Sequence, residues 1–318
     1  MAITYPDHDV TSPAERAPLL PRRPAGGRAP RSAMLFLLPF GALFTLMVLA
    51  PIGYAVYESF FEVHRSGLGL SPTVAEFTGV SNYVKALQDR DFMTSILRVL
   101  LLGVVQVPVM LGLSLLLALL LDSRSARFRR TFRMIFFLPF AMPGAIAAIM
   151  WSFLYIPSVS PFTAALRTIG LNVDFLSGGL ALVSIGNMMT WGWTGYNMLI
   201  IHSALQAIPR ELFEAAVLDG CSGWRLAWHV KIPLVRPALI LTMVFSIIGT
   251  AQLYTEPDIL RRVASTVTAT YTPIMASQYS ANINNYNFAA AQAVILAVLT
   301  FVLSFGFLKF VQRKGFGA

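Results

Sequence analysis

Few side chains in this chain of 318 residues could carry out covalent chemistry. Glu256 and Asp258 have the short spacing of two catalytic carboxylates, but no soluble scaffold surrounds them, so we do not expect a glycosidase. His202 and His229 are too isolated to form a metal site, and the single cysteine, Cys221, forms neither an internal disulfide nor a CxxC motif. The sequence also lacks a G-x-x-x-x-G-K-S/T phosphate loop, so any nucleotide must be hydrolysed by another chain. We therefore expect no catalytic residue, no metal and no cofactor on this chain.

A polar, cationic insert at about residues 209–236 separates two long apolar segments. Pro209 suits the first position of a helix, where its missing N–H would be unpaired anyway. Glu211 and Glu214 lie in the first turns, where carboxylates complement the helix dipole. Gly220 is expected to end this helix, as glycine commonly does. The insert is therefore predicted to form a short helix, a glycine corner and a second short helix.

The first of these helices is expected to present a narrow apolar face with small residues at its centre. Its apolar positions recur at i, i+3 and i+4, and small residues let a helix lie close in the groove of a partner protein. The second helix is predicted to start near Ser222 and to stop at Pro233. The alternative is an ordinary connecting loop whose carboxylates are solvated. The residues assigned to docking are Glu211, Glu214, Ala215, Ala216, Asp219, Gly220 and Pro233.

A second group of polar and aromatic residues lies inside apolar segments, where such residues are expensive and often line a path. Carboxylates and amides could bind the hydroxyl groups of a solute, and flat rings could stack on it. The alternatives are helix–helix packing for the residues near Trp193, with Gly192 and Gly195 allowing close approach, and hydration or pairing with Arg261 or Arg262 for both Glu256 and Asp258. The candidate pathway residues are Asn187, Thr190, Trp193, Asn197, Gln252, Tyr254 and Glu256.

Long apolar segments must position all of these groups. Hydrophobic residues make up 56% of the chain and charged residues 12%, and the mean hydropathy of +0.66 is far above that of soluble domains. About 20 apolar residues in a helix cross a membrane, and only a helix or closed barrel pairs its backbone there. The sequence therefore predicts an all-α polytopic membrane protein. The six expected spans cover about residues 34–58, 97–121, 134–156, 180–208, 237–256 and 288–309.

The positions of Lys and Arg predict the orientation, because cytoplasmic loops accumulate them. Most of them fall on the cytoplasmic side if both termini lie there. The same residues explain the net charge of +9 through anionic lipid headgroups, so nucleic acid is not an expected partner. Residues 1–33, rich in Pro, Arg and Ala, are predicted to be a disordered cytoplasmic tail, followed by a membrane domain at residues 34–312.

The insert resembles the EAA loop of ABC importer permeases, on Glu214-Ala215-Ala216, Asp219-Gly220, Ile232-Pro233 and Pro237. The resemblance covers about residues 34–312. Phe77-Thr78-Gly79 with Asn82-Tyr83 resembles the F-x-G-x-x-N-Y stretch of the carbohydrate branch, which includes the maltose and glycerol-phosphate permeases. Residues 245–257, Tyr271-Thr272-Pro273 and residues 286–291 resemble the same branch. The chain departs from the family at Cys221, usually alanine, and at residues 258–262, usually aromatic and Gly-rich.

This resemblance implies a type I importer permease fold and half of the translocation pathway of an ATP-driven sugar importer. It also implies a second permease subunit, two ATPase subunits that carry ATP and Mg²⁺, and an extracytoplasmic sugar-binding protein. The location would be a bacterial plasma (inner) membrane. One alternative is a permease for another small polar solute. Another is a membrane enzyme or sensor with a cytoplasmic partner, and a third is a secondary transporter, which would need inverted repeats and embedded charges.

Overall fold

The computed structural model describes residues 31–64, 74–123 and 126–315, and these residues are mostly helical. The chain divides into two units, Met1–Pro51 and Ile52–Ala318. The predicted tail lies outside the described residues, except that its last three residues begin the first helix.

The first expected span consists of two helices joined by a π-helical segment. α1 (Arg31–Phe44) leads into η1 (Thr45–Leu49) and then into α2 (Ala50–Glu58). The backbone N–H of Ala50 bonds five residues back, to the carbonyl of Thr45. Pro51 explains this wider turn, because it offers no N–H to the carbonyl four residues before it.

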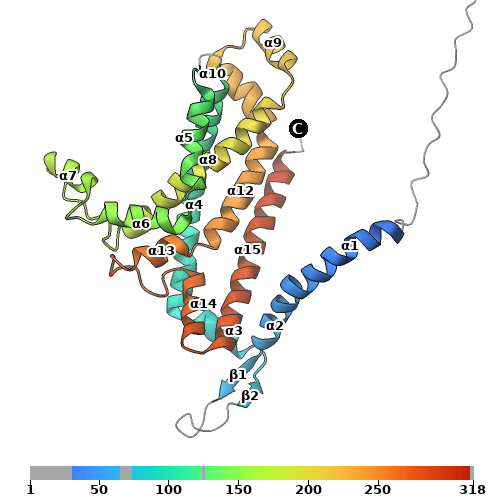
Figure 1. Ribbon diagram of the computed structural model, residues 1–318, viewed down its shortest axis with the longest axis vertical. Helices are drawn as coiled ribbons and strands as arrows, with labels where there is room; N and C mark the ends of the chain where they lie inside the picture. The colour runs from blue at the N-terminus through green and yellow to red at the C-terminus, as the bar shows by residue number, and fades with distance from the viewer. Residues whose placement is uncertain (1–30, 65–73, 124–125, 316–318) are drawn as a thin grey trace, which may run out of the picture. The chain divides into compact units, whose positions relative to one another are not determined.

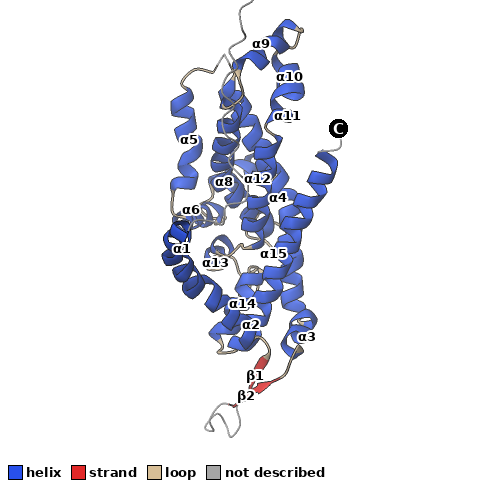
Figure 2. Cartoon of the chain, turned by 90° about the vertical axis from the view of Figure 1, so that its right-hand side faces the viewer, coloured by secondary structure: helices blue, strands red, loops and turns tan. Residues whose placement is uncertain are grey.

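Four helices form the bundle of the second unit (Figures 1 and 2). They are α4 (Arg90–Asp122), α8 (Ala181–Gln206), α12 (Arg236–Ala251) and α15 (Tyr286–Gly315). Polar bonds join them in the interior: Ser114 Oγ donates to the carbonyl of Thr194 at 2.9 Å, and Thr250 Oγ1 donates to Gln106 Oε1 at 3.3 Å. Such bonds satisfy polar groups that would otherwise be buried alone.

The third expected span is not one straight helix. α5 (Arg129–Ala141) and α6 (Gly144–Tyr155) meet at a bend of 92°, which can be followed in Figure 1. Met142 between them is extended, with ψ 140°, because the residue before Pro143 is disfavoured in the helical region. The bend divides the expected span 134–156 into two helices. The short helix α7 (Pro161–Thr168) follows.

The fifth expected span, 237–256, is interrupted as well. α12 ends at Ala251, and α13 (Thr255–Leu260) follows a break of three residues. α14 (Pro273–Asn282) then leads to α15, the sixth expected span. Leu253 and Leu260 anchor the break and α13 in the main hydrophobic core, together with Tyr271 and Met275.

Among the described residues, four helical stretches are long and apolar enough to cross a membrane: Leu35–Glu58, Arg90–Asp122, Arg236–Leu260 and Tyr286–Arg313. The bent α5–α6 pair would make a fifth. α8 forms a helix where the fourth span was expected, but it is not among these stretches, because polar residues such as Asn187 and Asn197 lower its hydropathy.

A small β-hairpin corrects the expectation of a purely α-helical chain. β1 (Phe61–His64) pairs antiparallel with β2 (Val74–Phe77), and α3 (Ser81–Gln88) follows. The hairpin lies at one end of the second unit, and α9 and α10 lie at the other (Figure 1).

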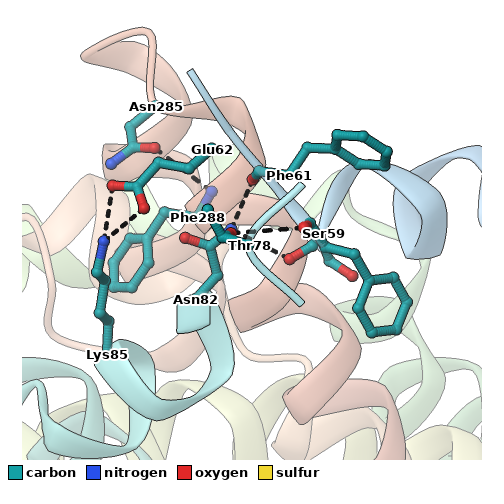
Figure 3. A network of polar contacts seen from close by, with 9 residues as sticks. Ser59, Phe61, Glu62, Thr78, Asn82, Lys85, Asn285 and Phe288 are labelled. Carbon is teal, nitrogen blue, oxygen red and sulfur yellow. Dashed lines mark hydrogen bonds and ion pairs between the residues drawn. The ribbon is translucent and has the colours of Figure 1, made fainter. Parts of the chain in front are cut away.

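The F-x-G-x-x-N-Y residues hold this hairpin against the bundle. Asn82 is 2% exposed and donates through Nδ2 to the carbonyls of Ser59 and Phe61, at 3.1 and 2.7 Å (Figure 3). Tyr83 contacts the Ser59 hydroxyl at 2.5 Å, and Lys85 pairs with Glu62 at 2.6 Å. In this structure the motif forms a local clamp: side chains of α3 hold the segment of residues 59–61.

We expect Asn82→Ala to lower the free energy of unfolding by about 1–3 kcal/mol, because it leaves two carbonyls without their donor. Asn285→Ala is the matched control: its side chain accepts one bond, from the N–H of Phe288 at 3.4 Å, at an exposed position. Thermal unfolding of the purified chain measures both. Equal losses in the two variants would contradict the clamp.

Candidate functional site

The predicted docking insert forms a helix that ends at a glycine corner. α9 spans Arg210–Leu218, with Pro209 one position before it, as N-cap rather than as the first helical residue. Gly220 has φ +83°, and the N–H groups of Gly220 and Cys221 bond back to the carbonyls of Val217 and Ala216, at 3.0 and 2.9 Å. Paired bonds of this kind close a helix through a left-handed residue, which glycine adopts at little cost.

The second part of the insert is helical over about the expected range. α10 (Gly223–Leu226), the π-helical η3 (Ala227–Lys231) and α11 (Ile232–Leu234) follow one another directly. Ser222 is the N-cap, as predicted, although its side chain makes no capping bond. The helix ends at Leu234, one residue beyond the predicted Pro233. The N–H of Ile232 bonds to the carbonyl of Ala227, and this π turn accommodates the missing N–H of Pro233.

The insert exposes both charged and large apolar side chains. The carboxylates of Glu211, Glu214 and Asp219 are exposed, and among the described residues they form no ion pair. Leu218 is 88% exposed, and the exposed rings of Trp224 and Trp228 stack at 5.9 Å. Exposed charge beside exposed large apolar groups is typical of a protein–protein contact.

One lysine anchors the insert to the bundle. Lys231 Nζ lies 2.5 Å from Asp122 Oδ2 at the end of α4, and both side chains are less than one-fifth exposed. The same ammonium lies 5.3 Å from the ring centroid of Phe213 on α9. Between the insert and the ends of α4 and α8 runs a groove of about 980 Å³. A force applied to α9 would therefore reach α4 through Lys231.

Part of the predicted pathway group lines a second cavity, of about 300 Å³. Trp193, Gln252, Tyr254 and Glu256 line it. The cavity lies where the α5–α6 bend, the α12–α13 break and the middle of α8 meet, since Met142, Gly192 and Gly249 also border it. Both helix interruptions thus open onto the same space.

The other candidate pathway residues do not line this cavity. Asn187 donates to the Tyr155 hydroxyl at 2.8 Å, and Thr190 donates to the carbonyl of Gly186 in its own helix at 2.7 Å. Asn197 is buried, with Nδ2 3.5 Å from Ser246 Oγ. The contacts of Asn187 and Asn197 join α8 to α6 and α12, whereas that of Thr190 stays within α8.

The cavity combines aromatic walls with a few polar groups. Phe140 packs against Trp193 and Tyr196, at ring centroid distances of 5.2 and 4.5 Å. Trp151 borders the cavity, and its Nε1 has no hydrogen-bond partner. Sequence reasoning missed Trp151, because nothing in its apolar surroundings marks it. Aromatic faces with sparse polar groups suit a small polar ligand.

Two neighbouring carboxylates have different surroundings. Asp258 pairs with Arg261 at 2.7 Å, one of the pairings considered above. Glu256 is half-buried at the cavity and has no ion pair among the residues that the structure describes.

A glycine brings α8 into direct contact with α5. A Cβ atom on Gly195 would lie 1.8 Å from the carbonyl oxygen of Phe136. Gly195 therefore takes part in helix–helix packing, the alternative considered above. Gly192 does not, because an added Cβ there would meet no other atom within 4 Å.

The apolar helices of the described residues indicate a multi-pass membrane protein. Residues 110–315 match the family of binding-protein-dependent transport system inner membrane components. The chain belongs to this family, whose members are permease subunits of transporters.

Relatives and a solved structure agree with this family. A probable ABC transporter permease protein of Pyrococcus horikoshii is 35% identical over 67% of this chain and 74% of its own. The lactose transport system permease protein LacF of Rhizobium radiobacter is 29% identical over 85% and 91%. A chain of the bacterial alginate ABC transporter, solved with an alginate pentasaccharide-bound periplasmic protein, has a TM-score of 0.73 at 21% identity, over 90% and 96%. That likeness shows a shared fold.

Proposed function

We propose that this chain is a permease subunit of an ATP-driven, binding-protein-dependent sugar importer, and that it couples to a separate ATPase through residues 209–236. The observation that carries the proposal is the exposed α9 with its exposed carboxylates, next to the Lys231–Asp122 pair that ties the insert to α4. Membership of the permease family supports it, as do the lactose and alginate transporters among its relatives and fold neighbours. In this proposal ATP is hydrolysed by the partner, and this chain has no catalytic role.

The proposed assembly contains a second, similar permease, two ATPase subunits that bind ATP and Mg²⁺, and an extracytoplasmic binding protein. The periplasmic protein in the solved alginate transporter supports the last of these. Closure of the ATPases would push on α9, and the Lys231–Asp122 pair would carry the movement to α4. The bundles would then rock around a central site, as in alternating access.

The proposed topology has six spans with both termini in the cytoplasm of a bacterial cell. α8 supplies the fourth span: its 26 residues extend about 39 Å at 1.5 Å per residue, enough to cross the hydrocarbon layer. Its low hydropathy fits a helix enclosed by others, since Ile185, Met198 and Ile201 are buried.

The proposed substrate pathway passes the 300 Å³ cavity. Trp193 would stack on a sugar ring, and Gln252, Tyr254 and Glu256 would bind its hydroxyl groups. Asn187, Thr190 and Asn197 would position α8 beside this path.

Affinity purification of the chain from its native membrane tests the coupling role. We expect the wild type to retain an ATPase and a second permease. In Glu214→Lys the amount of ATPase that copurifies should fall at least about tenfold, because a reversed charge at a docking contact opposes binding. The amount of the second permease should stay the same. Asp91→Lys, an exposed charge reversal in the first turn of α4 at the other end of the unit, is the matched control. If no ATPase accompanies the wild type, the proposed function is wrong.

A further inference from the structure

We propose that the 300 Å³ cavity selects solutes by charge: it admits neutral and cationic hydroxylated solutes and excludes anionic ones through Glu256. This inference rests on the proposed function, because it names the class of sugar that the pathway accepts.

The first step is the charge of the cavity lining. Among the described residues that line it, Glu256 is the one carboxylate, and no Lys, Arg or His is present. Two basic side chains have other partners: Arg261 pairs with Asp258, and Arg98 donates to the carbonyl of Tyr271 and lies over its ring at 4.7 Å. An anion in the cavity would therefore meet a carboxylate and no compensating cation among the described residues that line it.

The second step is the fixed position of Glu256. It lies in α13, directly after the break that follows α12. Its neighbour Pro257 is buried, and Leu260, one turn further on, is fully buried in the main core. These anchors hold the backbone of α13 in place, so Glu256 stays at the wall of the cavity.

The third step is the match between the remaining wall and a hydroxylated ring. A carboxylate accepts several hydrogen bonds from hydroxyl groups, and the side chains of Gln252 and Tyr254, which also line the cavity, can both donate and accept. Trp193, 42% exposed, offers a face on which a sugar ring can stack and which also attracts a cation. The same set therefore suits neutral and cationic sugars, whereas the carboxylate of a sugar acid would face the carboxylate of Glu256.

The experiment is equilibrium dialysis of three monosaccharides of matched size against the purified chain in nanodiscs, with whatever partner subunits it retains and without binding protein. The probes are glucose, glucosamine in its protonated form and glucuronate. We expect the wild type to bind glucose and glucosamine at least about tenfold more tightly than glucuronate, the size of effect that a unit charge has at short range in a protein of moderate effective dielectric.

Glu256→Gln keeps the size of the side chain and removes its charge, and it should bring the three affinities to within about threefold. Asp258→Asn, which removes one negative charge two residues away, outside the cavity lining, should keep the wild-type order. Equal binding of glucose and glucuronate by the wild type would overturn the proposal. So would an unchanged order in Glu256→Gln, or no binding of any probe by the wild type.

The same preparations separate this inference from the proposed function. The ATPase that accompanies the chain, and its rate of ATP hydrolysis, are measured on each sample before dialysis. A complex that retains the ATPase but does not discriminate by charge overturns the inference alone. A chain that retains no ATPase contradicts the proposed function, whatever the dialysis shows.

Discussion

Gly195→Ala should prevent α8 from packing against α5. The added methyl would lie 1.8 Å from the carbonyl oxygen of Phe136, 2.5 Å from its carbonyl carbon and 3.0 Å from the Cα of Phe137. All three atoms belong to the backbone, so no side chain can rotate away, and the two helices must separate. We expect the free energy of unfolding to fall by about 3 kcal/mol or more, at the upper end of overpacking effects and large against the 5–15 kcal/mol of a typical protein.

Thermal unfolding and the yield of monodisperse protein in detergent measure this effect. The matched control is Gly112→Ala in α4, where no atom lies within 4 Å of an added Cβ. There the change should be neutral or stabilising, since alanine favours a helix by about 0.5–1 kcal/mol over glycine. A Gly195→Ala protein as stable as the Gly112→Ala protein would show that the α5–α8 contact is not maintained in the membrane.

Lys231→Met should uncouple ATP hydrolysis from uptake while leaving the docking face of α9 intact. It removes one partner of a largely buried ion pair and the cation beside Phe213. The stranded carboxylate of Asp122 should destabilise the chain by about 1–3 kcal/mol, and uptake per ATP hydrolysed should fall by at least about tenfold. The measurement is transport and hydrolysis by the reconstituted complex.

A charge exchange separates the ion pair from other effects of the substitution. Asp122→Lys combined with Lys231→Asp should recover part of the coupling that each single change removes, and a double-mutant cycle gives the interaction energy. Lys85→Met is the control, because Lys85 and Glu62 are 48% and 29% exposed, and exposed pairs contribute about 0–1 kcal/mol. Equal uncoupling by Lys85→Met would argue against a specific path through Lys231.

Local chemistry made much of the docking insert predictable from the sequence. The end of α9 depends on a glycine that adopts φ +83° and on backbone bonds within six residues. Gly220 alone therefore predicts from the sequence where α9 ends. The same holds for the bend at Pro143, whose existence follows from the missing N–H. Its angle of 92° does not, because packing against α8 and α13 sets the direction of α6.

Contacts between residues that are far apart along the chain could not be predicted from the sequence. Asp122 and Lys231 are separated by 109 positions, and nothing local marks either as the partner of the other. Glu256 and Asp258 were equally ambiguous for a different reason: two residues in a helix differ by about 200° in direction, and only the packing of α13 decides which faces the cavity. The β-hairpin was missed because each of its strands is four residues long, too short for a clear alternating pattern.

The two π-helical segments have a consequence for comparing this chain with its relatives. Each ends two residues before a proline, η1 before Pro51 and η3 before Pro233. A π turn holds one residue more than the α-helical turn it replaces, so each segment is equivalent to a single-residue insertion. Relatives without the corresponding proline are expected to be one residue shorter at that point. An alignment without a gap there would equate residues that point about 100° apart around the helix downstream.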